Sequence, residues 1–137
     1  MTNPATLPGI VSQMIETPRL RQHVLMAGPA NGAPVLFIHG NASSATYWEA
    51  TMLALPSGYR GLAPDLRGYG LTETRPIDAT RGARDWSNDL TALLDALAID
   101  RAHVVGWSLG GAAAMQLTID HPARVYTLTL LFIGVQT

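Results

Sequence analysis

Apolar runs and amphipathic stretches alternate along most of this chain. Residues Val35–Ile38 form a continuous apolar run, which is typical of a strand covered on both faces. Further along, apolar residues recur at helical spacing and form one face of an amphipathic helix: Trp86, Leu90, Leu93, Leu94 and Leu97. Because strands and helices alternate from residue 35 onward, the pattern predicts an α/β fold with a mostly parallel sheet and right-handed crossovers.

Turn residues between the apolar runs set the expected boundaries. Two extended segments, 10–16 and 20–26, flank Pro18 and are expected to pair as antiparallel strands at the N-terminus. Further strands are expected over residues 35–38, 59–66, 102–107 and 125–133, and helices over 45–54, 86–97 and 110–119. In the first helix, Ser43 or Ser44 is the expected cap, and the candidate buried positions are Tyr47, Trp48, Met52 and Leu55.

The composition is that of a folded chain and excludes several function classes. Hydrophobic residues make up 47% of the 137 residues and charged residues 14%, which excludes a disordered chain, and the length favours a single domain. The formal net charge of −1 leaves no basic excess for nucleic acid or for an anionic membrane surface. With no Cys, the chain has no disulfide, no Cys-ligated zinc and no Cys nucleophile.

The sequence also lacks targeting and metal-binding patterns. No apolar run reaches the roughly 18 residues of a membrane-spanning helix, and the first residues do not resemble a signal peptide. We therefore expect a cytoplasmic protein. Because no His, Asp or Glu cluster has the spacing of a metal site, we expect neither a metal nor a cofactor.

The segment Gly106–Gly110 carries the pattern G-x-S-x-G. It lies where an apolar strand ends and an Ala-rich helix begins, which is the setting of a nucleophile elbow. In such an elbow a sharp turn projects the Ser hydroxyl from the sheet, and small residues on either side let strand and helix approach. We interpret Ser108 as a candidate nucleophile and Gly106 and Gly110 as the elbow glycines. The alternative is a glycine-bordered turn with an incidental Ser.

A second polar loop follows the apolar run at residues 35–38. We interpret His39-Gly40-Asn41 as an oxyanion loop, in which the backbone N–H groups of Asn41 and Leu109 would hold one carbonyl oxygen. His39 is expected to be a buried packing and hydrogen-bonding residue rather than a general base. Taken alone, this loop would be a strand-end His with local hydrogen bonds, and the neighbouring Ser108 motif favours the functional interpretation.

The third motif runs from Asp65 to Gly70. Either Asp65 or Arg67 could take part in catalysis, but a structural ion pair and turn at the mouth of the site is the favoured interpretation, since arginine cannot act as a base at neutral pH. His23 and His103 lie outside the motifs and are expected to be structural or surface residues.

These three motifs, in this order at strand ends, resemble the α/β-hydrolase superfamily over about residues 10–131. Dehalogenases and epoxide hydrolases of that family carry Asp as nucleophile, so Ser108 sets them aside. What remains resembles serine esterases, lactonases, C–C bond hydrolases and cofactor-free perhydrolases. The resemblance implies a small-molecule ester, lactone or related acyl substrate. Trp107 and Tyr47 are candidates for lining an apolar pocket, although core packing is the more common role for each of these residue types.

The resemblance also implies a triad acid and a triad His on later strands. Only 29 residues follow Ser108, and no acid–His pair among them matches the family's positions. His121 ends a helix about 15 Å long and is too far away. The chain therefore resembles a partial domain over 1–137, truncated after the sixth strand and without lid or C-terminal strands. We expect it to be inactive or nearly so alone.

Three interpretations remain open at this stage. The first is the nucleophile-bearing half of a serine hydrolase whose base comes from elsewhere. The second is a non-catalytic interaction module that pairs with itself through its exposed last strand. The third is a minimal hydrolase with an unusual base, such as His39 or a His of a partner chain.

Overall fold

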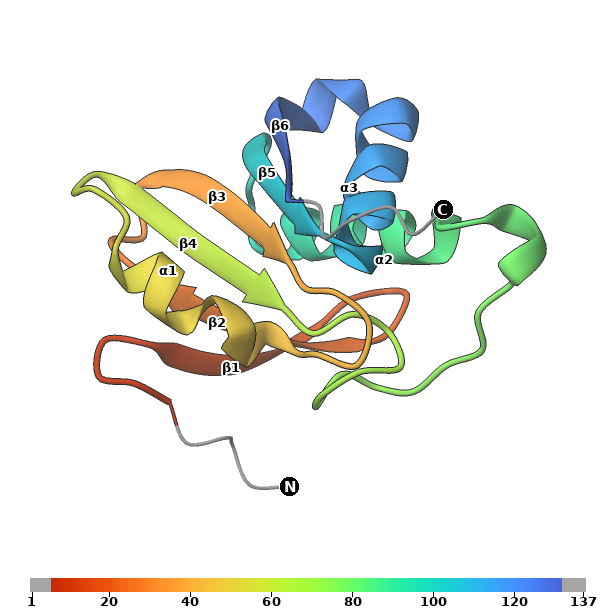
Figure 1. The fold of residues 1–137 in the computed structure, drawn as a ribbon, viewed down its shortest axis with the longest axis horizontal. Coiled ribbons are helices and arrows are strands. Elements are labelled where there is room, and N and C mark those ends of the chain that lie inside the picture. Colours follow the sequence, from red (N-terminus) through yellow and green to blue (C-terminus); the bar gives the residue numbers. More distant parts are fainter. Residues whose placement is uncertain (1–5, 132–137) are drawn as a thin grey trace.

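The computed structural model describes residues 6–131 and shows a six-stranded sheet with helices on both faces (Figure 1). The strands are β1 (Val11–Glu16), β2 (Arg21–Ala27), β3 (Ala33–Ile38), β4 (Tyr59–Pro64), β5 (Ala102–Trp107) and β6 (Val125–Leu131). The helices are α1 (Glu49–Leu53), α2 (Arg84–Ala96) and α3 (Leu109–Asp120), with 3-10 turns η1 (Ala45–Trp48), η2 (Ala79–Arg81) and η3 (Pro122–Arg124). The end of the last expected strand, beyond Leu131, lies outside the described residues.

The strand order is β1-β2-β4-β3-β5-β6. Strand β2 is antiparallel to β1 and β4, whereas β3, β4, β5 and β6 run parallel to one another. The mostly parallel sheet with an antiparallel N-terminal pair is therefore confirmed. Because β3 lies between β4 and β5, the carboxyl ends of these three strands meet at one edge of the sheet. All three sequence motifs start at that edge.

Two apolar clusters pack on the two faces of the sheet. On one face, α2 and α3 contribute Leu90, Leu93, Leu94, Ala113, Ala114 and Leu117, all fully buried. On the other face, Trp48 and Met52 pack against Phe37 of β3. The apolar stripe of α2 thus faces the sheet as its spacing predicts. None of the helices in residues 6–131 is both long and apolar enough to cross a bilayer.

The first helix differs from the prediction in form and in one buried position. The segment begins as the 3-10 turn η1 and continues as the short helix α1. Ser44 occupies the N-cap position, but its hydroxyl bonds to Thr46 Oγ1 at 2.7 Å rather than to the backbone. The expectation that Tyr47 is buried is wrong, because its side chain is 49% exposed. The tighter turn of a 3-10 segment changes the periodicity, so that Trp48 alone of this pair faces the sheet.

Candidate active site

Ser108 sits at the sharp turn between β5 and α3. Its backbone has φ 55° and ψ −117°, a left-handed conformation that is uncommon for a residue with a side chain. The turn is fixed on both sides, since Ser108 N–H donates to Leu131 O at 3.2 Å and Gly111 N–H donates to Ser108 O at 2.8 Å. The side chain is exposed at the strand edge. This is the geometry expected of a nucleophile elbow.

The two elbow glycines are required by the packing around this turn. A Cβ at Gly106 would come within 2.5 Å of Gly110 O, and a Cβ at Gly110 would overlap the carbonyl oxygens of Ile38 and His39. The start of α3 therefore lies directly against both the end of β5 and the end of β3. Any larger residue at either position would push the helix away from the sheet.

The loop after β3 lies beside the elbow. A Cβ at Gly40 would come within 2.8 Å of the Trp107 ring, so this glycine lets the loop pack against the residue before Ser108. Leu109 is the first residue of α3, and its N–H has no acceptor within the helix. Within residues 6–131, no acceptor contacts the N–H of Asn41 either. The Asn41 side chain is held by Tyr69, whose hydroxyl donates to Oδ1 at 2.6 Å.

His39 is fully buried and both of its ring nitrogens are occupied. Nδ1 lies 2.8 Å from Gly40 O, and Leu66 N–H donates to Nε2 at 3.0 Å. Nδ1 must therefore carry the proton, and the imidazole is neutral. Burial lowers the pKa of His39 below its usual value, although the bond to Gly40 O partly opposes this. His39 therefore ties the β3 loop to the β4 loop and has no lone pair free for Ser108.

Asp65 is buried at the end of β4 and accepts three hydrogen bonds. These come from His23 Nδ1 at 2.7 Å, Ala45 N–H at 2.8 Å and Leu71 N–H at 2.9 Å. Burial alone would raise the pKa of the carboxyl, but the bonds from His23, Ala45 and Leu71 outweigh it and lower the pKa below the usual range. Asp65 is therefore a carboxylate that organises the loops around the strand ends.

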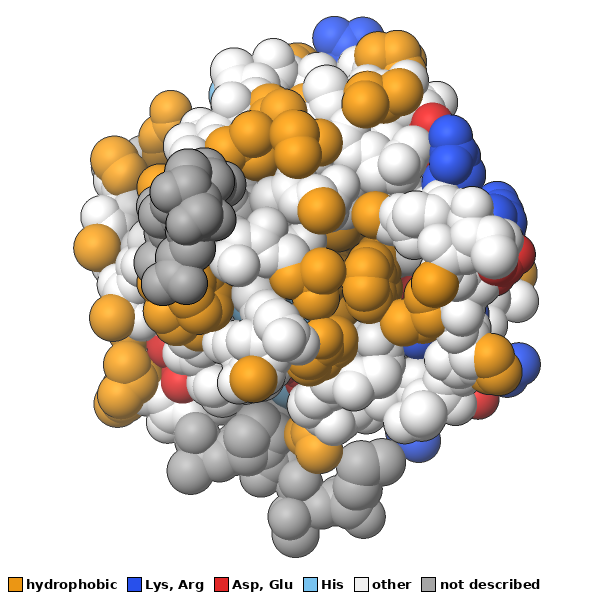
Figure 2. Space-filling view, turned by 45° about the vertical axis from the view of Figure 1, so that its right-hand side comes forward, with side chains coloured by type: hydrophobic (Ala, Val, Ile, Leu, Met, Phe, Trp, Pro, Cys, Tyr) orange, Lys and Arg blue, Asp and Glu red, His pale blue; other side chains and the backbone are white. Residues whose placement is uncertain are grey.

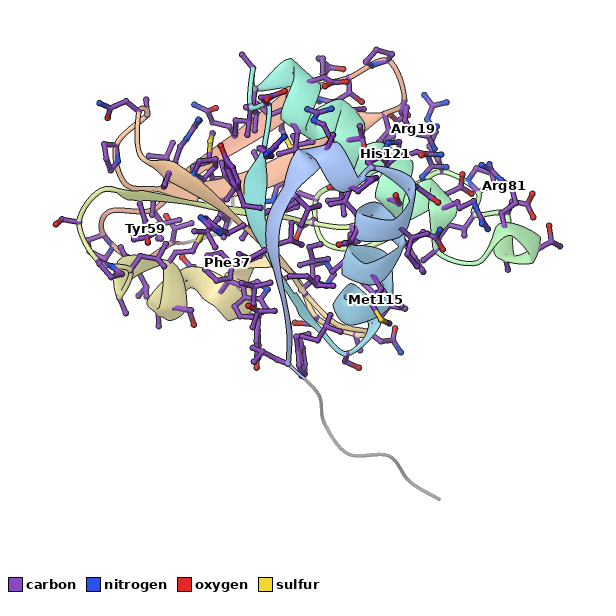
Figure 3. The ribbon with its side chains drawn as sticks, turned by 90° about the horizontal axis from the view of Figure 1, so that it is seen from above. Arg19, Phe37, Tyr59, Arg81, Met115 and His121 are labelled. Atoms are coloured by element: carbon purple, nitrogen blue, oxygen red, sulfur yellow. The ribbon has the colours of Figure 1, made fainter. Side chains whose placement is uncertain are left out.

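Arg67 does not pair with Asp65. Its Nε and Nη2 donate to the two oxygens of Asp89 on α2, each at 2.8 Å, and Arg19 Nε donates to the same Asp89 at 2.8 Å. Figure 3 shows Arg19, from the turn between β1 and β2, lying against α2. Arg67 thus forms a structural ion pair with Asp89, whereas Asp65 is hydrogen-bonded to His23. Arg67 anchors the loop that follows β4 onto the second helix.

Within residues 6–131, the Ser108 hydroxyl has no His partner. The chain's four His residues are all engaged elsewhere: His23 with Asp65, His39 with Gly40 and Leu66, His103 with Thr127, and His121 with Asn88. Helix α3 has 12 residues and is therefore about 18 Å long. His121 lies at its far end, as Figure 3 shows.

Tyr47 and Trp107 stack on each other beside the elbow. Their rings are nearly parallel, with centroids 4.3 Å apart. Tyr47 is the more exposed partner, and Trp107 is the ring that lies next to Gly40. One hollow in the described part of the chain lies elsewhere. It measures about 300 Å³ and is lined by residues such as Arg60, Ile99 and Tyr126 at the starting ends of the parallel strands. Because ligands of open α/β sheets bind at the carboxyl ends, the elbow edge is the better candidate site.

One arrangement at this edge could not be read from the sequence. Ser12 Oγ lies 2.6 Å from His23 Nε2, and His23 Nδ1 lies 2.7 Å from Asp65 Oδ2. The sequence predicts a structural or surface residue at position 23, and His23 is in fact 1% exposed and binds one of the motif residues. The three residues come from separate segments, and no local motif marks them. Among residues 6–131, no three His, Asp or Glu side chains are grouped as metal ligands.

The parallel sheet, the strained strand-to-helix turn and the loops at its edge define a protein of the α/β-hydrolase class. Residues 33–133 match the alpha/beta hydrolase fold family, and the chain belongs to this family. It is 35% identical, over 125 residues, to a 2-hydroxymuconate semialdehyde hydrolase of Pseudomonas sp. (strain CF600), covering 84% of this chain and 44% of that protein.

Solved structures show the same fold. An epoxide hydrolase mutant of Vigna radiata superposes with a TM-score of 0.83 at 35% identity, covering 93% of this chain and 40% of that one. A serine hydrolase from a Cycloclasticus bacterium superposes with a TM-score of 0.84 at 28% identity, covering 94% and 48%. The chain thus spans less than half the length of these relatives.

Proposed function

We propose that Ser108 is the nucleophile of a serine hydrolase that acts on a small ester, lactone or related acyl substrate. The observation that carries this proposal is the left-handed Ser108 backbone, held by the close packing of Gly106 and Gly110. Such a strained backbone persists only where the surrounding structure enforces it. Here the strained turn places the Ser108 hydroxyl at the surface. Relatives of this chain are named as hydrolases, which agrees with the reaction class.

The reaction would use the groups that surround this hydroxyl. Ser108 Oγ attacks the substrate carbonyl, and the N–H groups of Asn41 and Leu109 donate to the oxyanion. Leu109 adds the positive end of the α3 dipole. The bond between the carbonyl carbon and the alkoxy oxygen then breaks, and the alcohol leaves with the proton that the base took from Ser108. Water hydrolyses the ester formed on Ser108 and releases the acyl group as the acid. The stacked Tyr47 and Trp107 rings supply an apolar wall for the acyl chain.

The proton acceptor for Ser108 would come from outside residues 6–131. His39, which begins the oxyanion loop, has both ring nitrogens engaged in hydrogen bonds. This chain covers less than half of each relative, and the part that it does not cover is the natural source of a base. Without it the hydroxyl stays protonated at neutral pH and is a weak nucleophile. The 137-residue chain alone is therefore expected to hydrolyse esters poorly.

A chimera tests this proposal directly. The chain is fused to the part of the 35% identical semialdehyde hydrolase that it does not cover, and p-nitrophenyl acetate hydrolysis is measured on protein shown to be folded by circular dichroism. All chimeras carry Ser12→Ala, which removes the Ser that contacts His23. We expect activity in this chimera and its loss when Ser108→Ala is added. Ser57→Ala, at an exposed turn, is the matched control and should retain activity. Hydrolysis that survives Ser108→Ala would refute the assignment.

A second function, self-association, is favoured by the surface at β6. In the described chain β6 is an edge strand, and apolar side chains are exposed on it and on the adjoining α3: Met115, Ile119, Tyr126, Leu130 and Leu131. In Figure 2, which brings the α3 side forward, hydrophobic side chains gather in the middle of the face and Arg side chains lie at its rim. We propose that β6 pairs with the β6 strand of a second copy.

A further inference from the structure

A complete Ser–His–Asp arrangement lies outside the elbow. Ser12 on β1 lies 2.6 Å from His23 Nε2 on β2, and His23 Nδ1 lies 2.7 Å from Asp65 Oδ2 at the end of β4. Triads of this kind are recognised by geometry and roles rather than by sequence position. In residues 6–131 this is the one Ser whose hydroxyl contacts a His.

The electrostatics of the arrangement assign a role to each group. Asp65 accepts further hydrogen bonds from Ala45 and Leu71 and therefore stays ionised. The carboxylate fixes the proton of His23 on Nδ1, which leaves the Nε2 lone pair to accept the Ser12 hydroxyl proton. His23 is 1% exposed, so its ring cannot turn to water instead.

Access to the hydroxyl is provided by the position of Ser12. Strand β1 is at the edge of the sheet, and Ser12 is half-buried while His23 and Asp65 lie beneath it. Alternate N–H groups of an edge strand point away from the sheet and are free to donate to a bound group. A reagent can therefore approach the hydroxyl from the open side of β1.

We propose that Ser12 is a second nucleophile, activated by His23 and Asp65, which accepts phosphonyl or acyl groups from electrophiles with a good leaving group. With a fluorophosphonate, Ser12 Oγ bonds to phosphorus, the hydroxyl proton moves to His23 Nε2, and fluoride leaves with the P–F bonding pair. The Asp65 carboxylate stabilises the imidazolium that forms. This activity is independent of Ser108.

A purely structural role makes a different prediction. If Ser12 and His23 only tie β1 to the rest of the sheet, their replacement lowers stability but no adduct ever forms on Ser12. Covalent labelling therefore separates the two roles, whereas stability measurements do not.

The experiment is fluorophosphonate labelling of the folded 137-residue chain, read by intact mass and peptide mapping. We expect one adduct, located on Ser12, retained in Ser108→Ala and Ser57→Ala and lost in Ser12→Ala and His23→Gln. An adduct confined to Ser108, or none on the folded chain, would overturn the proposal. The elbow is tested separately in chimeras that already carry Ser12→Ala, where adding Ser108→Ala should abolish hydrolysis, so the two ideas fail independently.

A cysteine variant removes the dependence on how well Ser12→Ala folds. Since the chain has no Cys, Ser12→Cys introduces a single thiol. If His23 activates this position, iodoacetamide should react there about tenfold or more faster at neutral pH than with Ser57→Cys. Ser57 is the more exposed of the two, so access alone predicts the opposite order. Equal rates, or a rate unaffected by adding His23→Gln, would also overturn the proposal.

Discussion

Single residues at the strand ends decide how the elbow is built. A Cβ at Gly110 would overlap the backbone of Ile38 and His39, whereas a Cβ at the neighbouring Gly111 would meet Leu130 Cδ2 at 3.6 Å and Gly106 O at 3.8 Å, which are ordinary contact distances. Two adjacent glycines of one motif therefore have different physical roles. The first permits close packing of helix on sheet, and the second only lowers helix propensity.

This difference predicts that an alanine at Gly110 and an alanine at Gly111 have opposite effects on the free energy of unfolding. Gly110→Ala should lower the free energy of unfolding by about 1–3 kcal/mol or more, because the added methyl overlaps backbone that cannot move away. Gly111→Ala should be neutral or stabilise by up to about 1 kcal/mol through higher helix propensity. Urea denaturation measures both. Equal effects of the two substitutions would contradict the packing described for Gly110.

The buried imidazole of His39 makes stability depend on pH. Burial lowers its folded-state pKa, while the unfolded chain keeps a value of about 6.5. A neutral buried His contributes stability that is complete above the unfolded pKa and is lost as pH falls toward the folded pKa. Below about pH 6.5 the unfolded state binds the additional proton.

The free energy of unfolding should therefore fall between about pH 7.5 and pH 5.5, and less so in His39→Gln. Glutamine keeps a donor and an acceptor but does not titrate. The lowered pKa of Asp65 acts in a more acidic window and does not overlap this one. A pH dependence that is unchanged in His39→Gln would show that another group is responsible.

Between elements, one buried ion-pair network connects segments that are distant in sequence. Asp89 on α2 is fully buried and binds both Arg67 from the loop after β4 and Arg19 from the turn before β2. The side chain of Arg67 is only 9% exposed. The network therefore fixes the long loop and the N-terminal hairpin to the same helix.

Removing the shared carboxylate should leave a buried cation without a partner. Asp89→Ala is expected to cost about 3–5 kcal/mol of unfolding free energy. Asp95→Ala, on the same helix, removes a pair with Arg124 in which the carboxylate is 65% exposed, and should cost less than about 1 kcal/mol. Thermal or urea unfolding of both variants measures the two losses of unfolding free energy. Comparable losses would mean that burial does not control the strength of these pairs.

The elements with strong periodicity could be predicted from the sequence, and the ion pairs could not. The apolar stripe of α2 and the strand before Ser108 appear where their spacing places them. The first helix was harder to predict, because it begins with a 3-10 turn in which the Tyr47 side chain points away from the sheet. The partner of Arg67 lies 22 residues away and that of His23 lies 42 away, so both depend on the tertiary fold. The motif glycines worked as signals because their spacing around Ser108 is local, even though Gly110 packs against Ile38 and His39, which are distant in sequence.

At the scale of the whole molecule, the sheet of the described chain has two edge strands, β1 and β6, of different character. Strand β1 is held to β2 along its length, whereas β6 presents apolar side chains with no strand beyond it in the described chain. Ser108 lies beside this open edge, because its N–H bonds to Leu131 O of β6. Whatever covers β6 therefore also borders the candidate active site.

Self-association through β6 should depend on charge at that edge. Multi-angle light scattering on the size-exclusion column should show dimers or larger species for the 137-residue chain, because an unpaired apolar edge strand recruits another strand. Leu131→Lys should shift the mass toward the monomer, since a charge on an edge strand opposes pairing. Leu53→Lys on α1 is the matched control, because Leu53 and Leu131 are both 43% exposed. A monodisperse monomer for the unaltered chain, or equal dissociation by both substitutions, would rule out β6 as the contact.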